Sequence, residues 1–199
     1  MVTVNTGQWF VSSEGAQWWF DSGAVSLDFA YTGAMGDNPA WEDLHEPAQL
    51  GAWLAARYPR VDPSATAGDL IDAKALRRSI ANIALALSHE REPQPDDVDT
   101  LNLFAATPNI PPALVGGNRQ AGRSAVRPGQ ALSTIARDAV TLFTDNAGGR
   151  LRECAADDCA LVFYDESRSN TRRWCSMQRC GNRSKVRAHR ARNGGPTTR

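Results

Sequence analysis

The four cysteines of this chain lie near its C-terminal end, and their spacing is typical of a metal site. They form two Cys-x4-Cys pairs, Cys154 with Cys159 and Cys175 with Cys180, separated by fifteen residues. Zn²⁺ prefers four ligands in a tetrahedron, and two such pairs joined by a loop commonly supply four thiolates. We therefore expect one structural zinc ion bound by all four sulfur atoms. Two disulfides, or four unrelated thiols, are the alternatives.

Arginine is concentrated in the same stretch, where residues 168–192 contain nine basic side chains and no acidic one. Eight of the nine are arginines, and a guanidinium group can bind a phosphate through two parallel hydrogen bonds. Residues 182–192 are compatible with a helix, and residues 183, 187 and 190 would share one face of it. A solvated basic tail is the alternative to contact with nucleic acid. The predicted contact residues are Arg168, Arg172, Arg173, Arg183, Lys185, Arg187 and Arg190.

This region resembles the CGNR zinc finger, a family named for the tetrapeptide that stands here at 180–183. The similarity includes all four cysteines and the intervening segments 163–168 and 172–177. The resemblance implies a C-terminal zinc-binding module that binds DNA, in bacterial proteins regarded as transcription regulators. In such proteins the module usually follows an N-terminal domain called ABATE.

Residues 27–32 resemble the opening of the ABATE domain, in which a short strand leads into a helix with a Leu-Asp-Phe/Leu-Val-Asn-Thr pattern. Four of the six residues match, and Ala and Tyr replace Val and Asn. A carboxylate at position 28 would be buried on this otherwise apolar segment and would need a partner. An internal cap, or an ion pair with an arginine such as Arg77 or Arg78, could supply the partner; alternatively, Asp28 faces a ligand pocket.

Aromatic residues gather near the N-terminus, on both sides of a Ser-Ser-Glu-Gly segment at 12–15. This pattern predicts a β-hairpin over residues 8–20. The aromatic side chains are either ordinary core residues or the wall of a pocket for a small ligand. The residues of this candidate pocket are Asp28, Trp18, Trp19 and Tyr31.

Helical periodicity dominates the segment between the hairpin and the cysteines, with apolar residues repeating at intervals of three and four. In the longest helix, Arg77 and Arg78 are expected to point outward. Residues 105–130 are rich in proline and glycine and are compatible with a hairpin or a loop. The predicted helices are 47–58, 68–90, 96–104 and 131–146.

These elements predict an α+β protein with two parts. A mostly helical N-terminal domain, 1–148, carries a small β-hairpin sheet. A small four-cysteine zinc module, 149–199, combines a β-knuckle with a basic helix; strands at 150–152 and 161–164 flank its first cysteine pair, and Gly194-Gly195-Pro196 would end its helix.

Charge is distributed unevenly, although the net charge of the chain is zero. Residues 150–199 carry 12 Lys and Arg against 5 Asp and Glu, whereas residues 1–149 carry 10 against 17. A basic end on an acidic body favours a polyanionic partner that is met through one end only. Because no apolar run is long enough to span a bilayer and no signal peptide is evident, we expect a cytoplasmic protein without membrane contact.

Catalytic motifs are not apparent. The three histidines form no His-Glu-x-x-His pair, no Gly-x-Ser-x-Gly elbow is present, and a four-thiolate site has no open position for a substrate. We therefore expect no enzyme but a zinc-containing transcription regulator that binds duplex DNA. Its N-terminal domain would sense a small-molecule effector or form a homodimer. The alternative is an RNA-binding or protein-interaction module whose zinc is purely structural.

Overall fold

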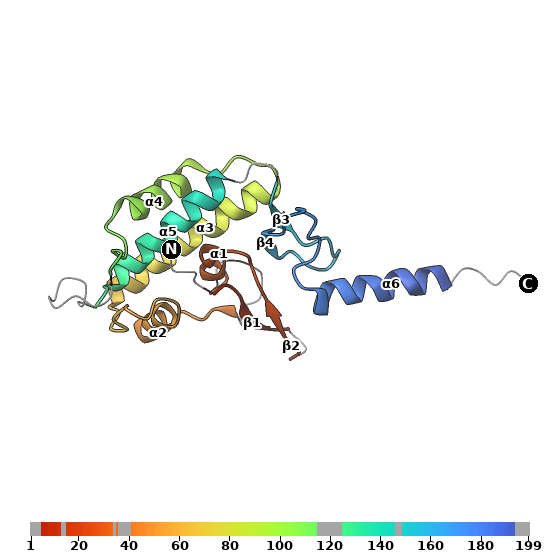
Figure 1. The fold of residues 1–199 in the computed structure, drawn as a ribbon, viewed down its shortest axis with the longest axis horizontal. Helices are drawn as coiled ribbons and strands as arrows, with labels where there is room; N and C mark the ends of the chain where they lie inside the picture. The colour runs from red at the N-terminus through yellow and green to blue at the C-terminus, as the bar shows by residue number, and fades with distance from the viewer. Residues whose placement is uncertain are drawn as a thin grey trace, which may run out of the picture.

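The chain folds as a helical body with a small β-hairpin, followed by a cysteine-rich module, so the predicted α+β class is confirmed (Figure 1). The computed structural model describes residues 5–12, 15–33, 35, 41–114, 125–145 and 149–193. In chain order the elements are β1 (Gln8–Val11), β2 (Gln17–Phe20), α1 (Val25–Ala30), α2 (Pro47–Arg57), α3 (Ala67–Ser88), α4 (Pro95–Ala106), α5 (Pro128–Thr144), β3 (Leu151–Glu153), β4 (Val162–Tyr164), the π-helical turn η2 (Met177–Gly181) and α6 (Asn182–Asn193).

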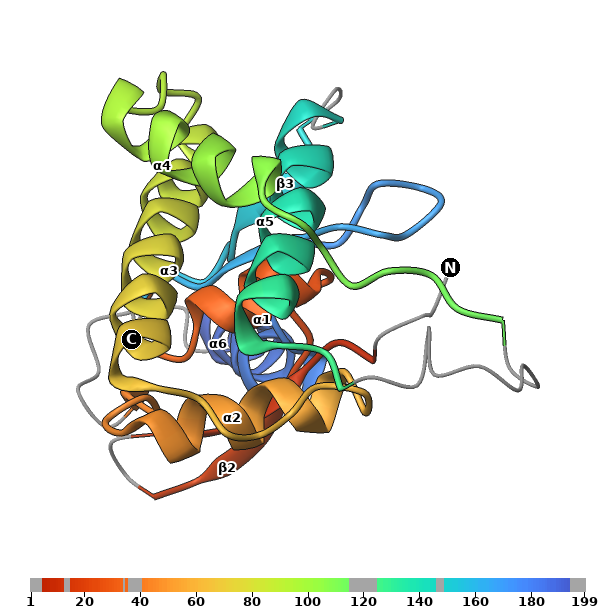
Figure 2. The same cartoon turned by 90° about the vertical axis from the view of Figure 1, so that its left-hand side faces the viewer.

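Helix α3 is the centre of the helical body. It begins with a reciprocal cap, in which the Thr66 hydroxyl accepts a hydrogen bond from the Asp69 N–H and the Asp69 carboxylate accepts one from the Thr66 N–H. Its buried face includes Leu76 and Ile80, both fully inaccessible. Helix α5 lies beside α3, α4 packs against both, and the short α1 contacts α3 and α5, while α2 lies at one end of the bundle (Figure 2). This packing places α1 at the middle of the core.

The N-terminal hairpin alternates cleanly between a buried and an exposed face, as expected for strands with one face on a core. Strands β1 and β2 pair antiparallel, with Trp9 opposite Trp19 and Phe10 opposite Trp18. Phe10 and Trp18 are buried, whereas Trp9 is 65% exposed and Trp19 is 42% exposed. The predicted hairpin is therefore present; residues 13 and 14 of its turn lie outside the described residues.

One helical prediction was wrong, because Arg77 points into the protein. Its side chain is 6% exposed and donates to the Thr32 carbonyl at 2.7 Å and to both carboxylate oxygens of Glu42 at 2.8 and 2.7 Å. Burial raises the pKa of Glu42, but the hydrogen bonds from Arg77 outweigh it and hold the pKa below its usual value. This bidentate pair compensates the buried guanidinium and ties α3 to the loop before α2. Arg78, by contrast, is exposed as expected.

The segment between α4 and α5 is only partly described. Residues 107–114 run without helix or strand, and Val126 forms an isolated parallel bridge with Val61. The glycine-rich run 116–122 lies outside the described residues, so neither the hairpin nor the loop interpretation can be assigned to it. None of the helices in the described part of the chain has both the length and the apolar composition needed to cross a bilayer.

The cysteine-rich module begins with an antiparallel pair, β3 and β4, that packs against α3. From this pair the chain continues through a loop to η2 and then α6, which extends away from the helical body (Figure 1). From Lys185 to Arg192 every described side chain of α6 is exposed. The helix therefore presents its basic side chains to solvent around its circumference. Gly194 and the residues after it lie outside the described residues.

Candidate metal centre and basic surface

The four cysteine sulfur atoms converge on one point, within 4.8 Å of one another. The Sγ atoms of Cys159 and Cys175 are 3.7 Å apart, and those of Cys175 and Cys180 are 3.5 Å apart. Thiolates about 2.3 Å from a tetrahedral zinc ion lie about 3.8 Å from each other, whereas a disulfide needs about 2.05 Å. The sulfur cluster therefore fits one zinc ion, as the spacing of the cysteines predicted. Zinc would supply folding energy here rather than an open catalytic position.

Backbone hydrogen bonds set the geometry of both cysteine pairs. The Cys154 N–H donates to the Leu161 carbonyl at 2.8 Å, and the Cys180 N–H donates to the Ser176 carbonyl at 3.0 Å. The Cys175 N–H points at the Cys154 sulfur at 3.4 Å, which joins one pair to the other. Such N–H···S contacts stabilise the negative charge that four thiolates leave on a zinc site.

Each residue of the Cys180–Arg183 tetrapeptide has a distinct structural role. Cys180 supplies a sulfur atom, and Gly181 leaves space for its neighbours, because a Cβ there would lie 2.6 Å from the Met177 sulfur. Asn182 begins α6. Arg183 reaches back, with its guanidinium 3.4 Å from the Cys180 sulfur and 3.2 Å from the Asp158 carboxylate. The tetrapeptide thus connects the metal cluster directly to the start of the basic helix.

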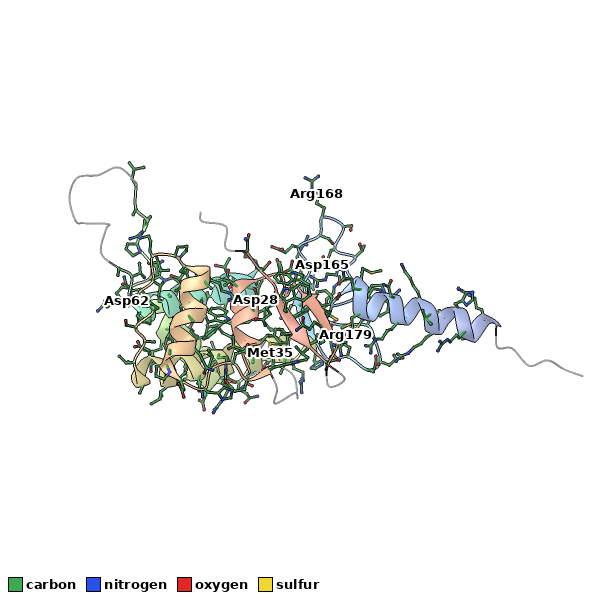
Figure 3. The ribbon with its side chains drawn as sticks, turned by 90° about the horizontal axis from the view of Figure 1, so that it is seen from below. Asp28, Met35, Asp62, Asp165, Arg168 and Arg179 are labelled. Carbon is green, nitrogen blue, oxygen red and sulfur yellow. The ribbon has the colours of Figure 1, made fainter. Side chains whose placement is uncertain are left out.

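Asp165 organises the loop between the two cysteine pairs. It is fully buried and accepts hydrogen bonds from the Ser167 N–H at 2.9 Å and the Arg172 N–H at 2.8 Å. Burial raises its pKa, but these hydrogen bonds outweigh it and keep the pKa below its usual value. Arg168 lies at the far end of this loop and points away from the molecule (Figure 3).

Arg172 is engaged within the protein itself. Its guanidinium donates to the carbonyls of Asp21 at 2.7 Å, Cys175 at 2.6 Å and Trp174 at 3.1 Å, and it lies 4.1 Å above the Phe163 ring. Burial lowers the pKa of this side chain. These contacts tie the end of β2 to the second cysteine pair. We therefore assign Arg172 to the junction, the region where the helical body meets the cysteine-rich module, and not to contact with a phosphate.

Three of the predicted nucleic-acid residues are brought together, on a cleft of about 350 Å³ between residues 155–158 and α6. Its lining includes Arg173, Arg183 and Arg187, and we call it the basic cleft. Arg187 donates to the Asp158 carboxylate at 2.8 Å, and this hydrogen bond lowers the pKa of Asp158. Arg168, Lys185 and Arg190 are exposed but do not line the basic cleft.

Asp158 is the residue that reasoning from sequence missed. It lies between the two cysteines of the first Cys-x4-Cys pair and forms ion pairs with both Arg183 and Arg187. Two adjacent acidic residues, Asp157 and Asp158, inside a cysteine pair of a module with net positive charge were the available signal. The Asp158 carboxylate lines the basic cleft beside the first turns of α6.

The four candidate pocket residues have different surroundings in the described part of the chain. Tyr31 is fully buried, and its hydroxyl donates to the Val162 carbonyl at 2.9 Å and accepts from the Val162 N–H at 2.7 Å. Trp18 is buried beneath Arg179, whose guanidinium lies 3.8 Å from the ring centroid; Arg179 marks this junction in Figure 3. Trp19 is partly exposed and lines a cleft together with Asp21 and Met177. Tyr31 and Trp18 therefore join the body to the module.

Asp28 is fully buried and has different partners from those expected. Its carboxylate accepts hydrogen bonds from the Ser22 hydroxyl at 2.6 Å and the Gly7 N–H at 2.7 Å, so the expected ion pair with Arg77 or Arg78 was wrong. Burial raises the pKa of Asp28 to about 6, against the lowering effect of these hydrogen bonds. Asp28 thus fixes the N-terminal segment and the start of α1 in place.

Fold and site together define a zinc-finger protein with a helical N-terminal domain. Residues 150–193 match the CGNR zinc finger, and residues 23–146 match the ABATE family, which carries the description "Putative stress-induced transcription regulator". The second match spans more than half of the chain, so the chain belongs to the ABATE family. No curated protein gave a match. Neither matching family is described as enzymatic.

Proposed function

We propose that this chain is a cytoplasmic transcription regulator that binds duplex DNA through its zinc module. The observation that carries the proposal is the convergence of Arg173, Arg183 and Arg187 on the basic cleft, beside a sulfur cluster that fits zinc. Arg183 and Arg187 are positioned by ion pairs with Asp158, and guanidinium groups are well suited to phosphate oxygens. The family description supports a role in transcription regulation.

Helix α6 supplies the rest of the proposed surface. It is basic and exposed on all sides beyond Ser184, and its length of 12 residues is compatible with lying in or along a groove of DNA. We propose that zinc fixes its first turn while the outer turns follow the DNA backbone. The proposed phosphate contacts are Arg168, Arg173, Arg183, Lys185, Arg187 and Arg190.

The two parts of the chain have different roles in this proposal. We propose that residues 149–199 contact DNA and that residues 1–148 regulate this contact, by binding an effector or by forming a homodimer. The acidic balance of the N-terminal part supports this division, because it would repel DNA outside the module. No catalytic role is proposed for either part.

Salt dependence of binding to a labelled duplex tests the proposal. If about five phosphates are neutralised, the logarithm of the affinity should fall with the logarithm of salt concentration with a slope of about −4 to −5. The measurement is fluorescence anisotropy with the zinc-loaded full chain. The double variant Arg187→Glu, Arg190→Glu should lose most of the affinity, whereas Arg78→Glu, an exposed substitution on α3, serves as the matched control.

Three outcomes would contradict the proposal. The first is that the chain binds no duplex DNA at low salt, or binds it with an affinity that does not depend on salt. Preference for single-stranded or duplex RNA in competition would favour the RNA-binding alternative. Unchanged binding in the double variant, with zinc content intact, would show that α6 is not the contact surface and would favour a protein-interaction module.

A further inference from the structure

A second cleft, of about 550 Å³, opens where β2 meets the loop that carries the second cysteine pair. We call it the junction cleft. It lies between the two parts of the chain, and its size is within the range of small-molecule sites. The residues of its lining that matter here are Trp19, Asp21, Arg173, Trp174, Ser176 and Met177.

Two large apolar side chains of the junction cleft, Trp19 and Met177, are exposed. Trp19 is 42% exposed and Met177 is 50% exposed, although both are large and apolar. Trp19 is held in place, because Trp9 packs edge-on against it at 5.6 Å and a Cβ on Gly7 would overlap its ring. Exposed apolar side chains gathered around a hollow are a common feature of ligand-binding grooves.

Among the charged residues that line the junction cleft, Arg173 is the one least engaged by the protein itself. The guanidinium of Arg172 is already bound to three carbonyls, and the Asp21 carboxylate accepts the Gly23 N–H at 2.9 Å. Arg173 is exposed, and within the described residues its guanidinium has a single contact, with the Trp174 ring at 5.1 Å. An anionic group of a ligand would therefore find its partner in Arg173.

Arg173 and Trp174 line both the junction cleft and the basic cleft. They form a ridge between the two, so any ligand that draws Arg173 into the junction cleft withdraws a cation from the basic cleft. Two ligands that compete for one side chain are linked thermodynamically, and the linkage is reciprocal. This arrangement offers a direct physical route from a small molecule to nucleic-acid affinity.

We propose that the junction cleft binds an aromatic acid, and that this binding weakens DNA binding by competing for Arg173. The ring would lie against Trp19, Trp174 and Met177, and the acidic group would pair with the Arg173 guanidinium. The regulatory half of this inference rests on the proposed DNA-binding function, whereas the binding half does not. The effector site would then lie at the junction and not among the buried residues around Asp28.

A matched pair of fluorescent probes tests the binding half. The probes are 8-anilinonaphthalene-1-sulfonate and N-phenyl-1-naphthylamine, which share a ring system and differ by the sulfonate. In the zinc-loaded chain, Arg173→Gln should lower the affinity for the sulfonate probe about tenfold, because the ion pair is lost. The affinity for the neutral probe should stay unchanged. Met177→Glu should weaken both probes.

Controls separate the junction cleft from other apolar surface. Leu103 is 68% exposed on α4, so Leu103→Gln should change neither affinity if the probes bind at the junction. The assignment of the cleft would be overturned if Leu103→Gln lost as much probe affinity as Met177→Glu. It would also be overturned if Arg173→Gln kept its affinity for the sulfonate probe with zinc content intact.

Duplex affinity at saturating probe tests the regulatory half. The sulfonate probe should weaken duplex binding about threefold to tenfold, the range expected for a modest coupling between two sites, and the neutral probe should not. If the chain binds no DNA, the proposed function fails while the two-probe result still stands or falls by itself. If DNA binding is intact and the sulfonate probe leaves it unchanged, the competition for Arg173 is refuted.

Discussion

Neighbouring arginines in this chain have opposite roles. Arg172 is bound to three carbonyls and to the Phe163 face, whereas Arg173 is exposed against Trp174. Sequence reasoning treated the two alike, because composition and charge cannot distinguish a guanidinium that joins two segments from one that faces solvent. The difference depends on where β2 ends in space, which is a property of the assembled fold.

Asp158 is expected to restrain DNA binding, since its carboxylate occupies Arg183 and Arg187. In Asp158→Asn the negative charge is gone, so both guanidinium groups become free for phosphate. We expect duplex affinity to rise about threefold to tenfold, with a salt slope steeper by about 1 to 2. Fluorescence anisotropy at several salt concentrations would measure both quantities.

Asp157→Asn is the matched control for this prediction. Asp157 lines the same cleft, and its substitution removes the same charge, but the ion pairs to α6 in the described part of the chain are made by Asp158. A smaller gain in Asp157→Asn would indicate a specific release of the two arginines. Equal gains in both variants would reduce the effect to general repulsion between the module and DNA.

Asp28 should make the stability of the fold depend on pH. Its pKa is raised from 3.8 to about 6 by burial, so the folded state prefers the protonated form. The stability it contributes is complete below the unfolded pKa, near 3.8, and is lost as pH rises through the folded pKa. One pKa unit corresponds to about 1.4 kcal/mol, so the whole shift corresponds to about 3 kcal/mol.

Comparison with Asp28→Asn isolates this contribution, because changes in zinc affinity with pH affect both chains equally. Between about pH 5 and about pH 8, the wild-type chain should lose roughly 1.4 kcal/mol of unfolding free energy relative to the variant. Urea unfolding at each pH measures the difference, and Asp99→Asn, an exposed substitution on α4, should show none. A difference that is independent of pH would contradict the raised pKa.

At the scale of elements, most of the fold followed from local patterns. Aromatic residues on both sides of the segment 12–15 predicted the hairpin, and apolar repeats predicted α2, α3, α4 and α5 with small errors at their ends. Periodicity failed at Arg77, because the pairing with Glu42 joins residues far apart in sequence. The cysteine spacing predicted the metal cluster without error, since four thiolates and one zinc ion allow few geometries.

Helix α6 should be dispensable for folding and essential for DNA binding. Among the described elements it packs against η2, and its side chains from Lys185 to Arg192 are exposed. Removal of residues 185–199 should therefore retain one equivalent of zinc and change the thermal midpoint little. Duplex affinity should fall at least tenfold, and the salt slope should become shallower by about 2 to 3.

A charge-neutral helix separates the shape of α6 from its charge. Replacing Lys185, Arg187 and Arg190 with Gln keeps good helix formers at each position, so the helix should persist. If the charges make the contact, this triple variant should lose as much affinity as the truncated chain. Retained affinity in the triple variant would instead assign the contact to the backbone or the apolar side chains of α6.

For the whole molecule, the two parts predicted from sequence share one continuous hydrophobic core. Phe163 and Val162 of the module are fully buried in the same cluster as Leu27 of α1. Tyr31 pairs with Val162, and a Cβ on Gly23 would lie 2.3 Å from the Tyr164 carbonyl, so only glycine permits this approach. Sequence reasoning could not anticipate the junction, because local patterns carry no information about which surfaces meet.

A shared core predicts that the zinc-loaded chain unfolds in one cooperative transition. Far-ultraviolet circular dichroism follows the helical body, and reactivity of the four thiols follows the module; both should change at the same temperature. Zinc removal by a chelator should lower the midpoint of both signals, because zinc binds the folded state in preference to the unfolded one. Tyr31→Phe leaves both polar groups of Val162 buried without this partner, so it should lower both midpoints together, at a cost of about 1–3 kcal/mol of unfolding free energy.

The two transition temperatures decide what the boundary near residue 149 separates. If the thiols of the zinc-loaded chain react at a temperature well below the loss of helical signal, the module unfolds independently and the boundary separates two folding units. If the two transitions coincide, the boundary separates functions alone.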